Sequence, residues 1–340
     1  MDGAVIEVDG LVKVFKGGVR ALDGLSLAVA PGSVYGLLGP NGAGKTSLIR
    51  ILATLLQPEE GSARVAGVDV RADPAGVRAR IGLAGQAAAV DDHLTGRENL
   101  EQVGRLYGLS RGQARQRAGE VLERIGLAEA ADRQVQTYSG GMRRRLDLTA
   151  SLVGRPRVLL LDEPTAGLDP ASRQELWALV AELVGAGTTV VLTTQYLEEA
   201  DRLADRIAVL DHGRLVSEGT GDQLKDRVGG AVLELTVPEH ARARTLSALP
   251  GVGGQDPTDA RRRGKIVLPA PDGARTLTEA LGRLEAAGVV PEEVALRKPT
   301  LDEVFLALTG QVATTPTGTG PDPGGGPRRH GQQQPEGAAR

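Results

Sequence analysis

The sequence contains no cysteine and few aromatic residues, and both absences narrow its possible functions. A chain of 340 residues without cysteine forms no disulfide, no thiolate metal site and no cysteine nucleophile. Aromatic residues make up 2% of the chain and hydrophobic residues 41%, so we expect a core of Leu, Val, Ile and Ala. Histidine is also scarce, and the four residues lack the spacing of metal ligands: His93, His212, His240 and His330.

An excess of one charge and a long apolar run are missing as well. The 40 basic and 43 acidic residues give a formal net charge of −3, which leaves no electrostatic footprint for a nucleic-acid partner. No apolar run reaches the ~20 residues that span a bilayer, and the acidic start at residues 1–7 does not resemble a signal peptide. We therefore expect a cytosolic chain that reaches any membrane through a partner.

Apolar periodicity divides the chain into three parts. Residues 4–230 read as an α/β domain, residues 231–310 as a small α+β domain, and residues 311–340 as a disordered tail rich in Thr, Pro, Gly and Gln. The continuous apolar run at 158–161 is typical of a strand buried on both faces of a parallel sheet. The other expected elements are strands at 34–39, 81–84, 188–193, 231–237, 265–269 and 290–297, a hairpin at 206–216, and helices at 45–56, 96–107, 110–126, 170–185, 239–248, 275–287 and 301–308.

A glycine-rich segment between an expected strand and an expected helix predicts a phosphate-binding loop. It matches the pattern G-x-x-x-x-G-K-[ST], in which glycines let backbone N–H groups approach phosphate oxygens and the next helix presents its positive N-terminus. Lys45 would reach the terminal phosphates, and the Thr46 hydroxyl would bind Mg²⁺. An ordinary glycine turn would need both pattern and context to coincide by chance. The predicted ATP-binding residues are Gly39, Pro40, Asn41, Gly42, Ala43, Gly44, Lys45, Thr46 and Ser47.

Two carboxylates follow the apolar run at 158–161. Asp162 would hold Mg²⁺, mostly through water, and Glu163 would orient or deprotonate the attacking water. Phosphoryl transfer depends mainly on positioning and charge neutralisation, so one metal-holding and one water-handling carboxylate suffice. The alternative is a strand that ends in two solvated acids, but the phosphate-binding loop upstream favours the catalytic interpretation.

Ser139, Gly140 and Gly141 form a second glycine-rich helix start. Ser139 is a favourable N-cap, and the N-terminus of the following helix can hold an anion. Alone, this pattern predicts no more than a turn. A simple P-loop kinase or GTPase would have no use for a second anion-binding helix start.

Together these motifs resemble the ATP-binding cassette (ABC) family, whose signature is Leu-Ser-Gly-Gly-Gln. Further family motifs are present, namely Phe15 where an aromatic ring stacks on adenine, Gln86 at the glutamine that senses Mg²⁺ and the permease, Gly167-Leu168-Asp169 at the D-loop and Thr193-Thr194-Gln195 at the switch. The resemblance implies a P-loop ATPase fold with a helical subdomain and the cofactors ATP and Mg²⁺. It implies the catalytic residues Glu163, Gln195 and Lys45, and the metal site Thr46, Gln86 and Asp162.

The family also implies a homodimer in which two copies pack head to tail. Each ATP would lie between residues 39–47 of one copy and Ser139–Gly141 of the other, which agrees with two separate anion-binding helix starts. Two departures from the family pattern stand out. Tyr138 and Met142 flank the Ser-Gly-Gly core, and Gln195 replaces the usual histidine. Glutamine cannot titrate, so we expect Gln195 to position phosphate without shuttling a proton.

Two segments, 193–201 and 301–310, are similar to drug-exporter ATPases of the daunorubicin-resistance type. This similarity implies export of an amphipathic drug or antibiotic through a separate ABC-2 type permease, with the chain bound peripherally at the cytoplasmic face of the cell membrane. The residues Leu301, Val304, Phe305 and Leu308 recur at helical spacing, and we interpret them as core of the small domain.

Other functions remain open at this point. An ABC-2 type ATPase could instead export a lipid or a polysaccharide, and a cassette ATPase could serve DNA repair or ribosomes. Repair ATPases carry a long coiled coil between phosphate loop and signature, whereas the interval here is under one hundred residues. Ribosomal types carry two tandem cassettes, and this chain has one. A binding role without turnover also fits if Gln195 impairs hydrolysis.

Overall fold

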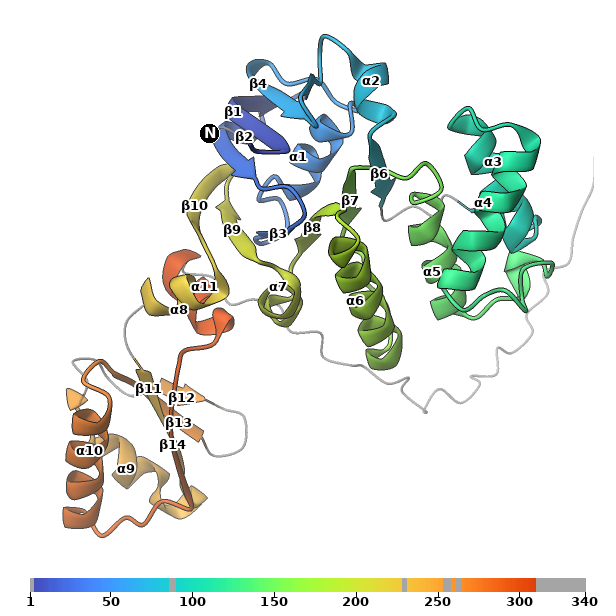
Figure 1. The fold of residues 1–340 in the computed structure, drawn as a ribbon. Helices are drawn as coiled ribbons and strands as arrows, with labels where there is room; N and C mark the ends of the chain where they lie inside the picture. Colours follow the sequence, from blue (N-terminus) through green and yellow to red (C-terminus); the bar gives the residue numbers. More distant parts are fainter. Residues whose placement is uncertain (1–2, 86–89, 228–230, 253–257, 261–264, 310–340) are drawn as a thin grey trace, which may run out of the picture.

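The computed structural model describes residues 3–85, 90–227, 231–252, 258–260 and 265–309. Its elements form three sheets, with helices packed around them (Figure 1). Gln86 and the expected tail at 311–340 lie outside the described residues.

The first sheet is four-stranded, antiparallel and ordered β2-β1-β4-β5. Apolar residues on one side of it, such as Leu11, Leu25 and Val65, are buried with the apolar side of the helix after the phosphate loop. The strands are β1 (Ile6–Val14), β2 (Arg20–Val29), β4 (Glu60–Val65) and β5 (Val68–Asp69).

The second sheet is six-stranded, ordered β10-β9-β3-β8-β7-β6, and parallel except for the β9–β10 hairpin. Every residue of β3, β7 and β8 is buried, which explains their continuous apolar sequences and confirms the expected parallel sheet and hairpin. The strands are β3 (Val34–Leu38), β6 (Ile81–Ala84), β7 (Val158–Asp162), β8 (Thr189–Thr194), β9 (Arg206–Asp211) and β10 (Arg214–Gly219).

Helices surround this sheet, and three of them stand apart as a helical unit, α3, α4 and α5 (Figure 1). Capping boxes begin α3, at Thr95 and Glu98, and α4, at Ser110 and Gln113. The first helix ends earlier than expected, because Thr54 has left-handed backbone at φ 62°. The helices are α1 (Lys45–Leu52), α2 (Pro74–Arg78), α3 (Gly96–Leu106), α4 (Arg111–Arg124), α5 (Gly140–Ala150), α6 (Pro170–Gly185), α7 (Leu197–Leu203) and α8 (Gly221–Arg227).

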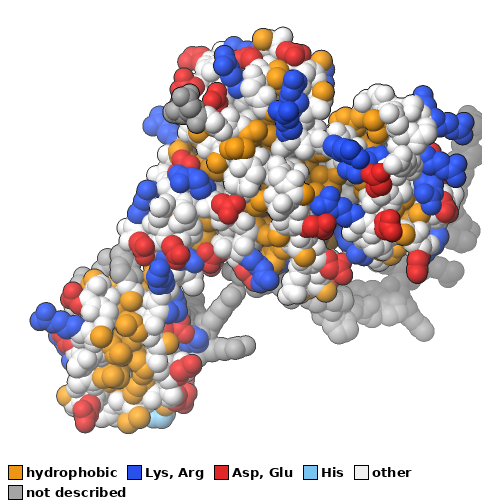
Figure 2. Space-filling view, viewed as in Figure 1, with side chains coloured by type: hydrophobic (Ala, Val, Ile, Leu, Met, Phe, Trp, Pro, Cys, Tyr) orange, Lys and Arg blue, Asp and Glu red, His pale blue; other side chains and the backbone are white. Residues whose placement is uncertain are grey.

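The third sheet is antiparallel and ordered β12-β13-β11-β14. With its two helices it has the β-α-β-β-α-β order of ferredoxin-like units, and its buried core is separate from those of the other sheets. Figure 2 shows apolar side chains gathered down the middle of this unit on the visible face. The elements are β11 (Ala231–Thr236), α9 (Arg242–Ala248), β12 (Thr258–Ala260), β13 (Lys265–Ala270), α10 (Ala274–Ala286) and β14 (Glu293–Arg297).

The last helix, α11 (Leu301–Thr309), corrects one expectation. Leu301, Val304 and Phe305 are buried, but they belong to a cluster with Leu197 of α7, Leu224 of α8 and residues of β3 and β9. The prediction that these residues belong to the core of the small unit is therefore wrong. Helical spacing predicts an apolar face, but it does not say which surface that face meets. The domain boundaries at residues 230 and 310 stay predictions.

Candidate active site

The predicted phosphate loop connects β3 to α1, and its glycines are required by space as well as by backbone angle. Gly42 and Gly44 have φ values of 83° and 104°, which side-chain-bearing residues rarely adopt. A Cβ on Gly44 would lie 2.4 Å from the carbonyl oxygen of Ala21, and one on Gly39 equally close to that of Leu210. This tight, side-chain-free turn before a helix fits a phosphate group.

Lys45 lies at the base of this loop with its side chain folded over it. Its Nζ donates hydrogen bonds to the carbonyl oxygens of Gly39, at 2.7 Å, and Pro40, at 3.0 Å. Burial lowers the pKa of Lys45, while the nearby carboxylates of Glu163 and Asp162 act in the opposite direction. The ammonium is thus held where the loop would receive phosphate, facing the two acids.

Asp162 ends β7 beside the phosphate loop. Its Oδ1 accepts hydrogen bonds from the hydroxyls of Thr46, at 3.1 Å, and Thr193, at 2.6 Å. The fold thereby brings together two predicted Mg²⁺ ligands, Thr46 and Asp162, that are 116 positions apart in sequence. Hydroxyl and carboxylate oxygens are hard donors that suit Mg²⁺. Among the described residues no group of three or more His, Cys, Asp or Glu could hold a metal, so phosphates and water would complete the shell.

The signature residues lie at the start of α5, as the sequence predicts. Ser139 is the N-cap, and its Oγ accepts from the backbone N–H of Met142 at 3.2 Å. Asp169 caps α6 in the same way and also accepts from Ser172 Oγ at 2.6 Å, a bond that lowers the pKa of Asp169. Signature and D-loop line one open hollow of about 400 Å³. Residues 39–47, all of them described by the structure, do not line it.

The remaining predicted residues are spread around this edge of the sheets. Phe15 follows β1, is 39% exposed, and lies under Lys13, whose Nζ is 5.6 Å from the ring centroid. Gln195 lies in the turn between β8 and α7, and Ser47 lies in α1. The Phe15 ring is thus accessible to solvent, as stacking on adenine would require.

Two residues that contact the acids are not predicted as site residues by the sequence motifs. The sequence marks Thr193 only as part of the switch segment, because a hydroxyl within a β-branched strand gives no sign of the hydrogen bonds it makes. Arg144 of α5 donates to the carbonyl oxygens of Gly85 at 3.0 Å, Glu163 at 3.3 Å and Pro164 at 2.9 Å. The sequence signal that could have indicated Arg144 is the run of arginines directly after the signature. Both contacts depend on packing between distant segments.

Comparison with known proteins decides the family. Residues 22–166 match the family described as ABC transporter. The chain is 52% identical to the daunorubicin resistance ATP-binding protein DrrA2 of Streptomyces coeruleorubidus, over 91% of this chain and 96% of that protein. The chain belongs to the ABC transporter family. The predicted family and the α/β P-loop cassette fold with a helical unit are therefore confirmed.

Other ABC ATPases share this full-length similarity. The daunorubicin/doxorubicin resistance ATP-binding protein DrrA of Streptomyces peucetius is 53% identical over 91% of this chain and 93% of its own length. The linearmycin resistance ATP-binding protein LnrL of Bacillus subtilis (strain 168) is 34% identical over 90% and 99%. The similarity thus extends past the cassette into the C-terminal unit.

Solved ABC cassettes share the fold of about two thirds of this chain. A dimeric cassette in a post-hydrolysis state, bound to ADP and phosphate, has a TM-score of 0.58 and 26% identity, covering 63% of this chain and 98% of that one. The ATP-binding subunit of an ABC transporter has a TM-score of 0.59 and 26% identity, covering 66% and 92%. No helix within the described part of this ABC ATPase is long and apolar enough to cross a membrane.

Proposed function

We propose that this ABC ATPase powers an ABC-2 type exporter of an amphipathic drug or antibiotic, as a homodimer bound to a separate permease at the cytoplasmic face of the cell membrane. The proposal is carried by the sequence identity of 52% and 53% between this chain and daunorubicin-resistance proteins. The identity extends along nearly their whole length and includes the C-terminal unit. Substrate choice would lie in the permease.

The geometry supports a division of labour among the site residues. Lys45 and the loop at 39–47 would bind the ATP phosphates, and Phe15 would stack on adenine. Thr46, Asp162 and Gln86 would hold Mg²⁺, which would neutralise charge on the phosphates. Glu163 would orient or deprotonate the attacking water, and the Gln195 amide would donate a hydrogen bond to the γ-phosphate.

A second copy would complete each site. The hollow formed by signature and D-loop carries the exposed start of α5 and lies on a part of the surface that the phosphate loop of the same chain does not line. A helix start of this kind favours an anion such as a γ-phosphate. Head-to-tail pairing would place the phosphate loop of one copy against this hollow of the other, so that hydrolysis opens the pair.

An apolar hollow supports the permease partner. It has a volume of about 470 Å³ and lies between α2, β6 and the end of α3. Two of its leucines are strongly exposed, Leu55 at 60% and Leu106 at 82%. Exposed apolar surface of this kind is typical of protein interfaces. The strand β6, which lines the hollow, ends two residues before the predicted permease-sensing Gln86 in sequence, which supports docking of a cytoplasmic helix of the permease there.

Co-expression with a candidate ABC-2 type permease from the same genome tests the proposal. Expected are co-purification of both proteins, ATP hydrolysis stimulated by an anthracycline such as daunorubicin, and faster efflux of that drug from cells. Stimulation by a lipid or polysaccharide instead would favour the alternative exporter. Hydrolysis without any bound membrane protein would favour a soluble cassette ATPase and overturn the proposal.

A further inference from the structure

Thr193 contacts the carboxylate of Asp162 and the backbone N–H of Glu163 at once. It is the fifth residue of β8 and is completely buried. Its Oγ1 donates to Asp162 Oδ1 at 2.6 Å and accepts from the backbone N–H of Glu163 at 2.9 Å. One hydroxyl therefore uses its donor on the metal-holding acid and its acceptor on the main chain of the water-handling acid.

The contact with Glu163 matters because the backbone there is strained. Glu163 has φ 50°, a left-handed conformation that costs an L-residue about 1 kcal/mol or more. Its N–H is held by the hydroxyl and, at 3.2 Å, by the carbonyl oxygen of Thr193, while its own carbonyl oxygen accepts from Arg144. The turn is thus held from both sides, by β8 and by the signature helix α5.

The contact with Asp162 determines how that carboxylate meets Thr46. Oδ1 accepts from both threonine hydroxyls, one on each neighbouring element, β8 and α1. Without the Thr193 donor, only the longer bond from Thr46 would orient this oxygen among the hydrogen bonds described here. A carboxylate that rotates more freely binds a metal ion less tightly, because hydrogen bonds from surrounding residues keep a metal ligand in the right orientation.

We propose that Thr193 is a positioning residue, whose hydroxyl sets the orientation of the Asp162 carboxylate and holds the left-handed backbone of Glu163. The proposal rests on the proposed ATPase function of these acids. It also gives β8 a direct role, since the same strand leads into Gln195 two residues later. A shift of the switch segment would be passed to both acids through one side chain.

The variant Thr193→Val tests this assignment, because it removes the hydroxyl, keeps the shape and leaves the backbone bond to Glu163. We expect kcat for ATP hydrolysis to fall about 10–100-fold with KM for ATP within about twofold, since the loop at 39–47 is untouched. Thr193→Ser keeps a hydroxyl and should restore most of kcat. The control is Thr189→Val on the same strand, where a buried hydroxyl accepts from Gly32 N–H at 2.9 Å, far from the acids.

A second readout is independent of turnover. The affinity of the full chain with ADP for Mn²⁺ can be measured from the decrease of the free Mn²⁺ signal in electron paramagnetic resonance. This affinity should fall about tenfold in Thr193→Val and remain unchanged in Thr189→Val. Unchanged kcat and Mn²⁺ affinity in Thr193→Val would overturn the proposal, as would equal losses in both valine variants. A failed drug-export assay would overturn the exporter function and leave the Mn²⁺ result standing.

Discussion

Gln195 is the residue whose chemistry departs most from the family pattern. An amide donates and accepts hydrogen bonds but does not titrate in the physiological range, so we expect Gln195 to position phosphate without transferring a proton. Around it, buried side chains such as Thr193 and Glu199 connect the switch segment to the acids and to α6. Among these residues, Gln195 is predicted to bind phosphate, whereas buried residues such as Thr193 hold the binding groups in place.

Replacing Gln195 with histidine should leave the ATPase active and add a pH dependence near neutrality. An imidazole with its usual pKa changes charge between pH 5 and 8, whereas the native amide stays neutral. The measurement is kcat of the assembled complex from pH 6 to 8, for both proteins. Parallel pH profiles of variant and native protein would contradict the role given to this position.

Glu199→Gln should stabilise the fold at alkaline pH. Glu199 is fully buried on α7, its Oε1 accepts from Trp177 Nε1 at 3.3 Å, and burial raises the pKa of this carboxyl. The native state therefore holds the proton to higher pH than the unfolded chain, so the stabilising contribution present at low pH is lost as pH rises through the folded pKa. Glutamine keeps the acceptor and avoids the buried charge. We expect a higher melting temperature at pH 8 and a smaller gain at pH 5; a gain independent of pH would contradict this account.

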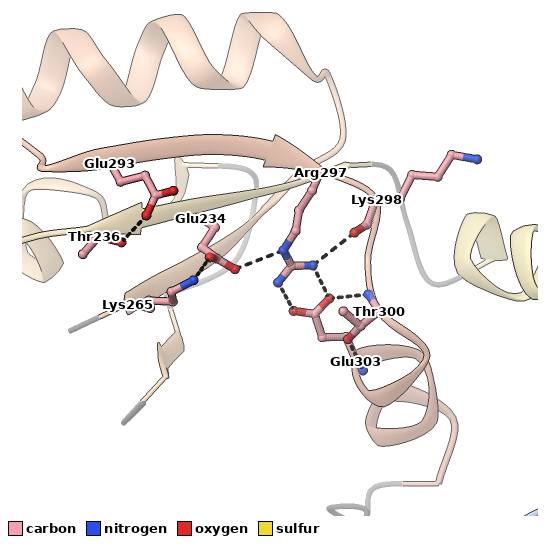
Figure 3. Close-up of polar contacts among 8 residues, drawn as sticks. All are labelled: Glu234, Thr236, Lys265, Glu293, Arg297, Lys298, Thr300 and Glu303. Atoms are coloured by element: carbon pink, nitrogen blue, oxygen red, sulfur yellow. Dashed lines mark hydrogen bonds and ion pairs between the residues drawn. The ribbon is translucent and has the colours of Figure 1, made fainter. Parts of the chain in front are cut away.

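At the scale of elements, an ion network joins the third sheet to α11. Arg297 of β14 donates to Glu234 of β11 at 3.0 Å and forms two bonds to Glu303 of α11, at 2.8 and 3.0 Å (Figure 3). Glu303 also accepts from the backbone N–H of Thr300 at 2.8 Å and so caps its own helix. Because α11 packs on α7 and α8, Arg297 links the C-terminal sheet to the cassette.

Arg297→Ala should loosen this link. The Arg297 side chain is 30% exposed, so after allowance for solvent screening we expect the free energy of unfolding to fall by about 1–2 kcal/mol. Limited proteolysis should cut faster between β14 and α11, and the melting temperature should fall. Lys298→Ala is the matched control, since the neighbouring Lys298 makes exposed pairs with Asp222 and Asp226. An equal loss of stability in both variants would show that Arg297 contributes no more to the link than the exposed Lys298 does.

At the scale of the whole molecule, the two anion-binding helix starts face different neighbours. The phosphate loop meets Asp162 within the chain, whereas the start of α5 opens into the hollow beside the D-loop. We therefore propose that a nucleotide joins the two across a pair of chains. The C-terminal unit adds its own core, and α11 returns to the cassette.

The Glu163→Gln variant should therefore trap a closed pair with ATP. Hydrolysis should fall by about 100-fold or more, because the water-handling carboxylate becomes a neutral amide, while the loop still binds ATP. In the complex with permease, cross-links between residue 43 of one copy and residue 140 of the other should form with ATP and not with ADP. Equal cross-linking with either nucleotide would contradict the two-chain site.

The sequence by itself determined the local features. The phosphate loop, the acids after a buried strand, the capped start of α5 and the small α+β unit all follow from short-range patterns, because glycine angles, capping and apolar periodicity act within a few residues. Only the tertiary structure decided what each of these features touches. It joined Thr193 and Arg144 to the acids and placed the apolar face of α11 on the cassette, because such contacts depend on how distant elements pack, which a linear pattern does not encode.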